Sequence, residues 1–293
     1  YTESFTSLLE LLDDQRFARN ILPDEKQLSQ VMIRRLKSDL VDADGKPLYA
    51  QRKLQALAVP YTDEEREIHQ KLNDYCASRE KDAEKTGSSF GTSFVNQLLK
   101  KRLFSSPAAF ASTLEKHIAS LSNGARPKVQ DAMAERILRK AILKVDEDYA
   151  DDQEVESAQS EAVEEASRRS PPLTPDQQRM LADLRQWAQR AKNQTDSKAR
   201  AIIEWLSANL KPGGQWNDRR VILFTEYRTT HQWMHQILAS HGFGGERLGL
   251  LHGGLSQEER EPIKAAFQAS PQDSPVRILL ATDAASEGID LQN

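Results

Sequence analysis

The chain has 293 residues, of which 29% are charged and 38% are hydrophobic. This length favours about two folded units, and the composition excludes a wholly disordered chain. Forty Lys and Arg residues against 44 Asp and Glu residues give a formal net charge of -4, so the chain is not a uniformly basic nucleic-acid coat protein. A single cysteine, Cys76, excludes an internal disulfide framework and a cysteine-based zinc site.

The sequence holds no spaced histidine pair of the H-E-x-x-H kind and no apolar run long enough for a membrane span. We therefore expect no metal site and no membrane partner. Its first residues are acidic where a signal peptide would be basic and then apolar. Tyr1 in place of Met, and Asn293 directly after a strand-like stretch, favour a piece of a longer protein.

The first part of the chain predicts short helical and extended elements. Apolar residues at helical spacing predict a helix over Ser4–Asp13, and Leu54–Val59 reads as a strand. Thr62 and Glu65 form a capping box, so a long helix is expected to begin there and to be broken over Gly87–Gly91.

Two adjoining segments carry opposite charge. Asn96–Lys144 is an apolar helical region with an excess of cations, which suits either an accessory DNA or partner surface or a solvated helix face. The cations in question are Lys100, Lys101, Arg102, Arg126, Lys128, Arg136, Arg139 and Lys140. Val145–Ala166 follows with ten acids and no Lys or Arg, and we expect a solvated helix or mobile linker without a specific partner.

The last third of the chain alternates strands with helices. Two helices, opening at Thr174 and after Asp196, precede this pattern. The expected order is a strand at Val221–Phe224, a helix at Thr229–His241, a strand at Leu248–Leu251, a helix after Ser256 and a strand at Arg277–Ala281. Wholly apolar strands in a βαβαβ order predict a parallel sheet that is covered on both faces, and hence an α/β fold from about Arg220 onward.

Small, polar and glycine-containing segments follow each predicted strand. They are Thr225–Arg228, His252–Gly254 and Thr282–Asp290. Ligands of parallel sheets bind beyond the carboxyl ends of the strands, and backbone approach to phosphates needs such residues. Each segment by itself could equally be a helix cap or a plain loop, but their order and spacing favour a phosphate-binding edge.

Three stretches resemble motifs IV, IVa and V of superfamily-two helicases: Val221–Tyr227, Leu251–Ser256 and Ile278–Gln292. Together with the R-R-x-K-x-D-L segment that begins at Arg34, the last stretch is similar to the Swi/Snf group of double-stranded DNA translocases, and Tyr1–Asn20 looks like a segment of bacterial members. The resemblance implies a P-loop NTPase-type (RecA-like) parallel sheet in the C-terminal third, preceded by a mostly helical region.

The resemblance also implies how the chain divides and what it lacks. Residues 1–55 would follow the first RecA-like lobe and link the lobes, 56–190 would be a helical insertion with the acidic stretch, and 191–293 would be the truncated second lobe. The G-x-x-x-x-G-K-[ST] loop and the D-E-x-H box of the first lobe do not occur here. ATP with Mg²⁺ would therefore bind the full-length protein, and we expect no catalytic residue, no tight cofactor and no ATP hydrolysis in this chain alone.

The family's site residues carry over by motif. Those expected at the nucleic-acid backbone are Thr225, His252, Gly253, Thr282 and Asp283. Those expected toward the nucleotide are Glu287, Gly288 and Asp290, and those expected between the lobes are Arg34, Arg35, Lys37 and Asp39. The inter-lobe cations could instead form a structural ion-pair network.

The expected activity is ATP-dependent DNA translocation or helicase-like remodelling. Its expected partners are double-stranded DNA, the missing first lobe and a protein on the helical insertion, in a bacterial cytoplasm near the nucleoid. Another nucleotide-binding α/β enzyme, such as a dehydrogenase, would carry a G-x-G-x-x-G turn, which is absent. A degenerate, non-catalytic DNA-binding or protein-interaction module stays open as the alternative.

Overall fold

The computed structural model describes residues 2–33, 35–50, 53–122 and 152–283. The chain divides into two compact units, residues 1–56 and 57–293. The division into three parts that the sequence suggests stays a prediction. Within the described residues, no helix combines the length and the apolar character needed to cross a bilayer.

The first unit is built from short elements. They are α1 (Thr2–Leu12), α2 (Glu25–Val31), a 3-10 turn at Lys37–Asp39 and an isolated antiparallel bridge between Val41 and Pro47. The helix expected at Ser4–Asp13 is confirmed as α1, in which Leu9 is buried, and Phe17 in the segment that follows is buried too. The strand expected at Leu54–Val59 is wrong: Leu54 is 93% exposed, and within the described residues these six positions pair with no strand.

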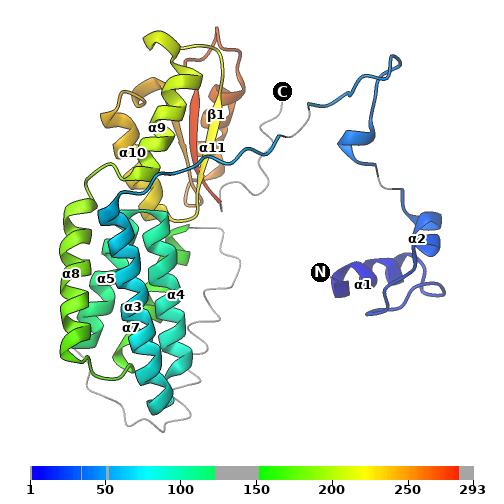
Figure 1. Ribbon diagram of the computed structural model, residues 1–293. Coiled ribbons are helices and arrows are strands. Elements are labelled where there is room, and N and C mark those ends of the chain that lie inside the picture. Colours follow the sequence, from blue (N-terminus) through cyan, green and yellow to red (C-terminus); the bar gives the residue numbers. More distant parts are fainter. Residues whose placement is uncertain (1, 34, 51–52, 123–151, 284–293) are drawn as a thin grey trace. The chain divides into compact units, whose positions relative to one another are not determined.

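Five helices of the second unit pack into a bundle (Figure 1). They are α3 (Asp63–Thr86), α4 (Ser89–Ser105), α5 (Pro107–Ser122), α7 (Asp152–Arg168) and α8 (Pro175–Ala191). Capping boxes open α3 at Thr62 and α8 at Thr174, as the sequence predicts, and Gly87 ends α3 with a left-handed φ of 72°. The core of the bundle includes the fully buried Leu99, Leu114 and Leu184.

The acidic stretch is expected to be a solvated segment without a partner, and for its described part this expectation is wrong. Its described part is α7, which packs against α4 and α5. Ala158, Ala162, Val163 and Ala166 are buried and recur at helical spacing, so they form an apolar face within an acidic sequence. Small apolar residues at a period of 3.6 bury this helix, although its overall composition is that of a solvated segment.

The sheet domain confirms the predicted α/β alternation. Its elements are α9 (Ser197–Leu210), β1 (Val221–Thr225), α10 (Arg228–Ser240), β2 (Leu248–Leu251), α11 (Gln257–Gln268) and β3 (Ile278–Thr282), with 3-10 turns at Pro212–Gly214 and Gly245–Arg247. The strands are parallel, in the order β1-β3-β2.

Helices cover both faces of this sheet. Ile278 and Leu280 of β3 face the core that contains residues of α9 and α10, whereas Leu279 and Ala281 face α11. This alternation follows from the two-residue period of a strand. The packing at Gly249 is close, because a Cβ atom there would lie 3.2 Å from Cδ1 of Leu279 and 3.4 Å from Cγ2 of Ile263.

Candidate nucleic-acid interface

The carboxyl ends of the three strands lie at one edge of the sheet. Thr225 at the end of β1 is the register partner of Thr282 at the end of β3, and Leu251 at the end of β2 is the partner of Ala281. The segments that the sequence singles out after each strand therefore begin side by side. Open parallel sheets bind their ligands at this edge.

Two of the predicted phosphate donors converge on a single oxygen atom. The backbone N–H of Gly253 donates to Oδ2 of Asp152 at 2.7 Å, and the hydroxyl of Thr282 donates to the same Oδ2 at 2.6 Å. Asp152 is the first residue of α7 and is buried, as is Thr282. An N–H and a hydroxyl that both point at one anionic oxygen form an anion-binding arrangement.

Arg260 of α11 fixes the loop that carries Gly253. Its guanidinium donates to the carbonyl oxygens of Gly253 and Leu255, the latter at 2.9 Å. A capping box of Ser256 and Glu259 holds the start of α11, as predicted. The Gly253 carbonyl is thereby held by Arg260, while the Gly253 N–H points to the sheet edge, where it donates to Asp152.

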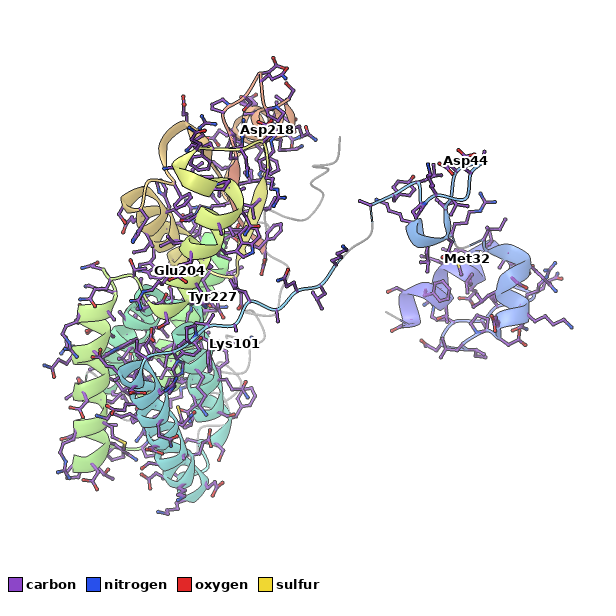
Figure 2. The ribbon with its side chains drawn as sticks, turned by 45° about the horizontal axis from the view of Figure 1, so that its top comes forward. Met32, Asp44, Lys101, Glu204, Asp218 and Tyr227 are labelled. Atoms are coloured by element: carbon purple, nitrogen blue, oxygen red, sulfur yellow. The ribbon has the colours of Figure 1, made fainter. Side chains whose placement is uncertain are left out.

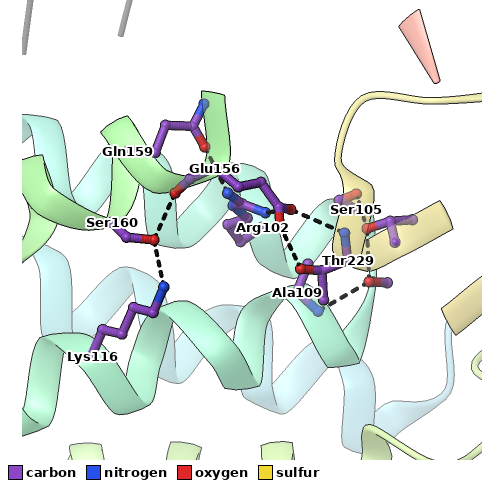
Figure 3. Close-up of polar contacts among 10 residues, drawn as sticks. Arg102, Ser105, Ala109, Lys116, Glu156, Gln159, Ser160 and Thr229 are labelled. Carbon is purple, nitrogen blue, oxygen red and sulfur yellow. Dashed lines mark hydrogen bonds and ion pairs between the residues drawn. The ribbon is translucent and has the colours of Figure 1, made fainter. Parts of the chain in front are cut away.

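A second carboxylate of α7 contacts the start of α10 (Figure 3). Glu156 accepts hydrogen bonds from the backbone N–H of Thr229 at 3.0 Å and from the Thr229 hydroxyl at 2.9 Å. It also pairs with Arg102 of α4 at 2.8 Å, and Arg102 donates to Gln159 at 2.6 Å. An acidic group at a helix N-terminus is favourable, so Glu156 joins α4, α7 and α10.

Neighbouring contacts strengthen the same junction. The hydroxyls of Ser105 and Ser106 lie 2.7 and 2.8 Å from that of Thr230. The guanidinium carbon of Arg102 lies 3.8 Å from the centroid of the Tyr227 ring, and Figure 2 places Tyr227 where the bundle meets the sheet domain. Burial is the main cause that raises the pKa of Tyr227.

The remaining predicted contact residues lie around the same edge. The hydroxyl of Thr225 donates a long hydrogen bond, 3.4 Å, to the carbonyl of Ala281. The His252 ring lies 5.9 Å from the His231 ring in a T-shaped arrangement. Burial lowers the pKa of His231 to about 4, and its Nε2 lies 3.0 Å from the Leu280 carbonyl.

Negative charge gathers close to these donors. The pKa of Asp283 is raised, first by partial burial and then by the charges of Glu226 and Asp152. Glu226 itself lies 4.0 Å from the ammonium group of Lys101. The edge thus offers neutral N–H and O–H donors beside several carboxylates.

Several predicted residues lie elsewhere. Glu287, Gly288, Asp290 and Arg34 lie outside the described residues, so their roles stay predictions. The other residues predicted to lie between the lobes, Arg35, Lys37 and Asp39, belong to the first unit, and their inter-lobe role stays a prediction. There the Lys37 ammonium lies 5.3 Å from the Tyr49 ring, and Asp39 accepts a hydrogen bond from the Leu36 N–H at 3.3 Å.

The prediction for the basic helical region is wrong at one residue, Arg102. Arg102 is neither a solvated cation nor a free DNA contact, because it is buried and paired with Glu156. Lys101 is exposed and Lys100 is half-buried. The other predicted cations, Arg126, Lys128, Arg136, Arg139 and Lys140, lie outside the described residues.

Sequence reasoning missed three residues that shape this edge: Asp152, Glu156 and Arg260. A signal for the first two exists, because residues four apart on a helix share a face. That spacing shows that the two carboxylates point the same way. It does not show which part of the chain they meet.

The described residues include no group of three or more His, Cys, Asp or Glu side chains that could hold a metal ion. The donor set at the strand ends consists of N–H and hydroxyl groups, which suit an anion rather than a cation. In the structure these donors contact the carboxylate oxygen of Asp152.

Comparison with known proteins agrees with this geometry. Residues 198–293 match the family described as the helicase conserved C-terminal domain. A stretch of 78 residues, 27% of this chain, is 35% identical to an ATP-dependent RNA helicase, DBP3, of Phaeosphaeria nodorum, and it spans only 12% of that protein's length. No solved structure matches at the same stringency. Residues 198–293 are therefore similar to a helicase C-terminal domain, and their described part has an α/β fold of the RecA-like kind.

Proposed function

We propose that this chain is the second-lobe part of an ATP-dependent, helicase-like DNA translocase of the Swi/Snf type, and that it holds the nucleic-acid backbone. The observation that carries the proposal is the convergence of the Gly253 N–H and the Thr282 hydroxyl on one anionic oxygen at the strand ends. A phosphate oxygen is an acceptor of the same charge sign and hydrogen-bonding capacity as that carboxylate oxygen.

The chemistry of the edge suits contact that does not depend on base sequence. The Thr225 and Thr282 hydroxyls and the Gly253 N–H would bind phosphate oxygens, which position a nucleic acid without reading its bases. A motor that moves along any sequence needs contacts of this kind. Duplex DNA is the proposed substrate, and the RNA helicase among the relatives makes duplex RNA the comparison that the experiment must include.

The residues present do not fit a complete ATP and Mg²⁺ site. The sequence has no G-x-x-x-x-G-K-[ST] loop, and the described residues have no cluster of metal ligands. In the proposal, the first lobe of the longer protein supplies these groups. This chain contributes the backbone-binding edge, and by itself it does not hydrolyse ATP.

Binding of labelled nucleic acid by this chain tests the proposal. Fluorescence anisotropy with a short fluorescein-labelled DNA duplex of random sequence, and with the matching RNA duplex, gives Kd across a salt series. We expect Kd to rise with salt, because phosphate contacts release counterions. Thr225→Val keeps the shape of the side chain and should weaken binding by about tenfold, as the loss of one hydrogen bond to a charged group.

Thr195→Val is the matched control, because it removes a hydroxyl of similar partial exposure in the loop before α9. The proposal is overturned if neither the chain nor its Asp152→Ala variant binds either duplex, or if the two Thr→Val variants bind alike. Tighter binding of the RNA duplex would replace DNA by RNA as the substrate. In the longer protein, ATP hydrolysis that no nucleic acid stimulates would favour the degenerate binding module.

A further inference from the structure

Asp152 is a buried carboxylate that the sheet domain holds with neutral donors. Its relative exposure is 5%, and Oδ2 accepts from the Gly253 N–H and the Thr282 hydroxyl. Among the described residues, no Lys, Arg or His side chain forms an ion pair with it. A buried charge is costly unless it is well hydrogen-bonded. The strand ends therefore form a site that stabilises an anion by directed N–H and O–H groups.

The occupant of this site comes from the chain's own helical insertion. We propose that Asp152 occupies a phosphate position of the nucleic-acid interface, so that α7 is an autoinhibitory element that the nucleic-acid backbone must displace. This inference rests on the proposed function, because it assigns to phosphate the two donors that Asp152 now holds. A phosphate oxygen cannot accept from the Thr282 hydroxyl and the Gly253 N–H while Oδ2 of Asp152 does so.

The first residue of α7 and the rest of the helix are held by different contacts. Asp152 is the first residue of the helix, whereas the buried face begins at Ala158, one and a half turns further on. Glu156 lies between them and is held by Arg102 and Thr229. The first turn of a helix opens at low free-energy cost. Asp152 can therefore leave the strand ends while the bundle stays packed.

Negative charge around the carboxyl ends of the strands also opposes the binding of a phosphate. Burial is the first cause that raises the pKa of Asp283, and the charges of Glu226 and Asp152 raise it further, so both of these carboxylates lie near Asp283. An arriving phosphate therefore meets negative charge as well as occupied donors. Removing the Asp152 carboxylate would reduce the repulsion and free the donors together.

Three variants of the 293-residue chain test the inference in the same anisotropy assay. Asp152→Ala frees both donors, and Asp152→Asn keeps an acceptor but loses the charge. The matched control is Glu154→Gln, which removes one negative charge from an exposed position two residues away. We expect Asp152→Ala to tighten duplex binding about tenfold and Asp152→Asn by a smaller factor, with Glu154→Gln near the wild-type Kd.

Each other outcome has a distinct meaning. Weaker binding by Asp152→Ala would overturn the inference, because Asp152 would then position the donors for phosphate. Equal tightening by Glu154→Gln would also overturn it, since the effect would be general charge. Wild-type Kd values for both Asp152 variants would overturn it while leaving the proposed function intact, whereas absence of binding by every chain would overturn the proposed function itself. If Asp152→Ala lowers the Tm sharply, the isosteric Asp152→Asn decides.

Discussion

Replacing Arg102 by Met should uncouple the helical bundle from the sheet domain. Arg102 is buried, forms an ion pair with Glu156 at 2.8 Å, donates to Gln159 and lies over the Tyr227 ring at 3.8 Å. Met has a similar apolar reach, so the substitution removes charge and donors without leaving a large cavity. The variant therefore tests the polar contacts of this junction.

The expected loss in the free energy of unfolding depends on the hydrogen bonds that Glu156 retains in the variant. Removing one partner of a buried ion pair costs about 3–5 kcal/mol. The Glu156 side chain is 21% exposed and retains two hydrogen bonds from Thr229, which places the loss at the lower end of that range. The lost contact with the Tyr227 ring adds about 1 kcal/mol. We expect the free energy of unfolding to fall by about 3–4 kcal/mol.

Urea unfolding followed by tryptophan fluorescence measures this loss. Trp187 reports on the bundle and Trp233 on α10, so uncoupling should also separate the two transitions. The double variant Arg102→Met/Glu156→Gln should recover part of the stability, because the unpaired carboxylate is gone. A loss below about 0.5 kcal/mol in the single variant, or no recovery in the double variant, would refute the reasoning.

Three further predictions concern stability. Leu184→Ala, at a fully buried position of the bundle, should lower the free energy of unfolding in urea by about 3 kcal/mol. Leu11→Ala, at a position that is 84% exposed, should lower it by less than about 0.5 kcal/mol. Equal losses in the two variants would contradict the packing described. Gly249→Ala should cost about 1–2 kcal/mol, because its Cβ would press on Leu279 and Ile263, and an unchanged Tm would contradict that close approach. Burial lowers the pKa of His117 to about 3 from 6.5, so the unfolded chain binds the extra proton. Stability should therefore fall as pH drops below about 6.5, by up to about 1.4 kcal/mol per pH unit, and His117→Gln should flatten this slope in urea titrations at several pH values.

The sequence predicts the parts of the fold that depend on neighbouring residues. The capping boxes that begin with Thr62, Thr174 and Ser256 need only two residues three apart, and all three are confirmed. Strands β1, β2 and β3 follow from short apolar runs, and their parallel pairing follows from the helices between them. These signals are local, so a single sequence carries them.

The occupant of the candidate site depends on distant residues, and the sequence does not carry that information. Asp152 and Thr282 are 130 positions apart, and Arg102 and Glu156 are 54 apart. The acidic composition of α7 predicts exposure, whereas the small Ala face that buries it contributes little to an average over the segment. The strand-like pattern at Leu54–Val59 fails for the complementary reason, since a strand needs a partner that no local pattern supplies.

The strand order affects how the protein is made. β3 lies between β1 and β2, and each of these pairs with β3 and not with the other. A ribosome releases β1 and β2 first, so both emerge with open hydrogen-bonding edges and half-covered apolar faces. The sheet can close only when Ile278–Thr282 has left the exit tunnel. During that interval the open edges of β1 and β2 are the part of the nascent chain that is most exposed to pairing with other chains.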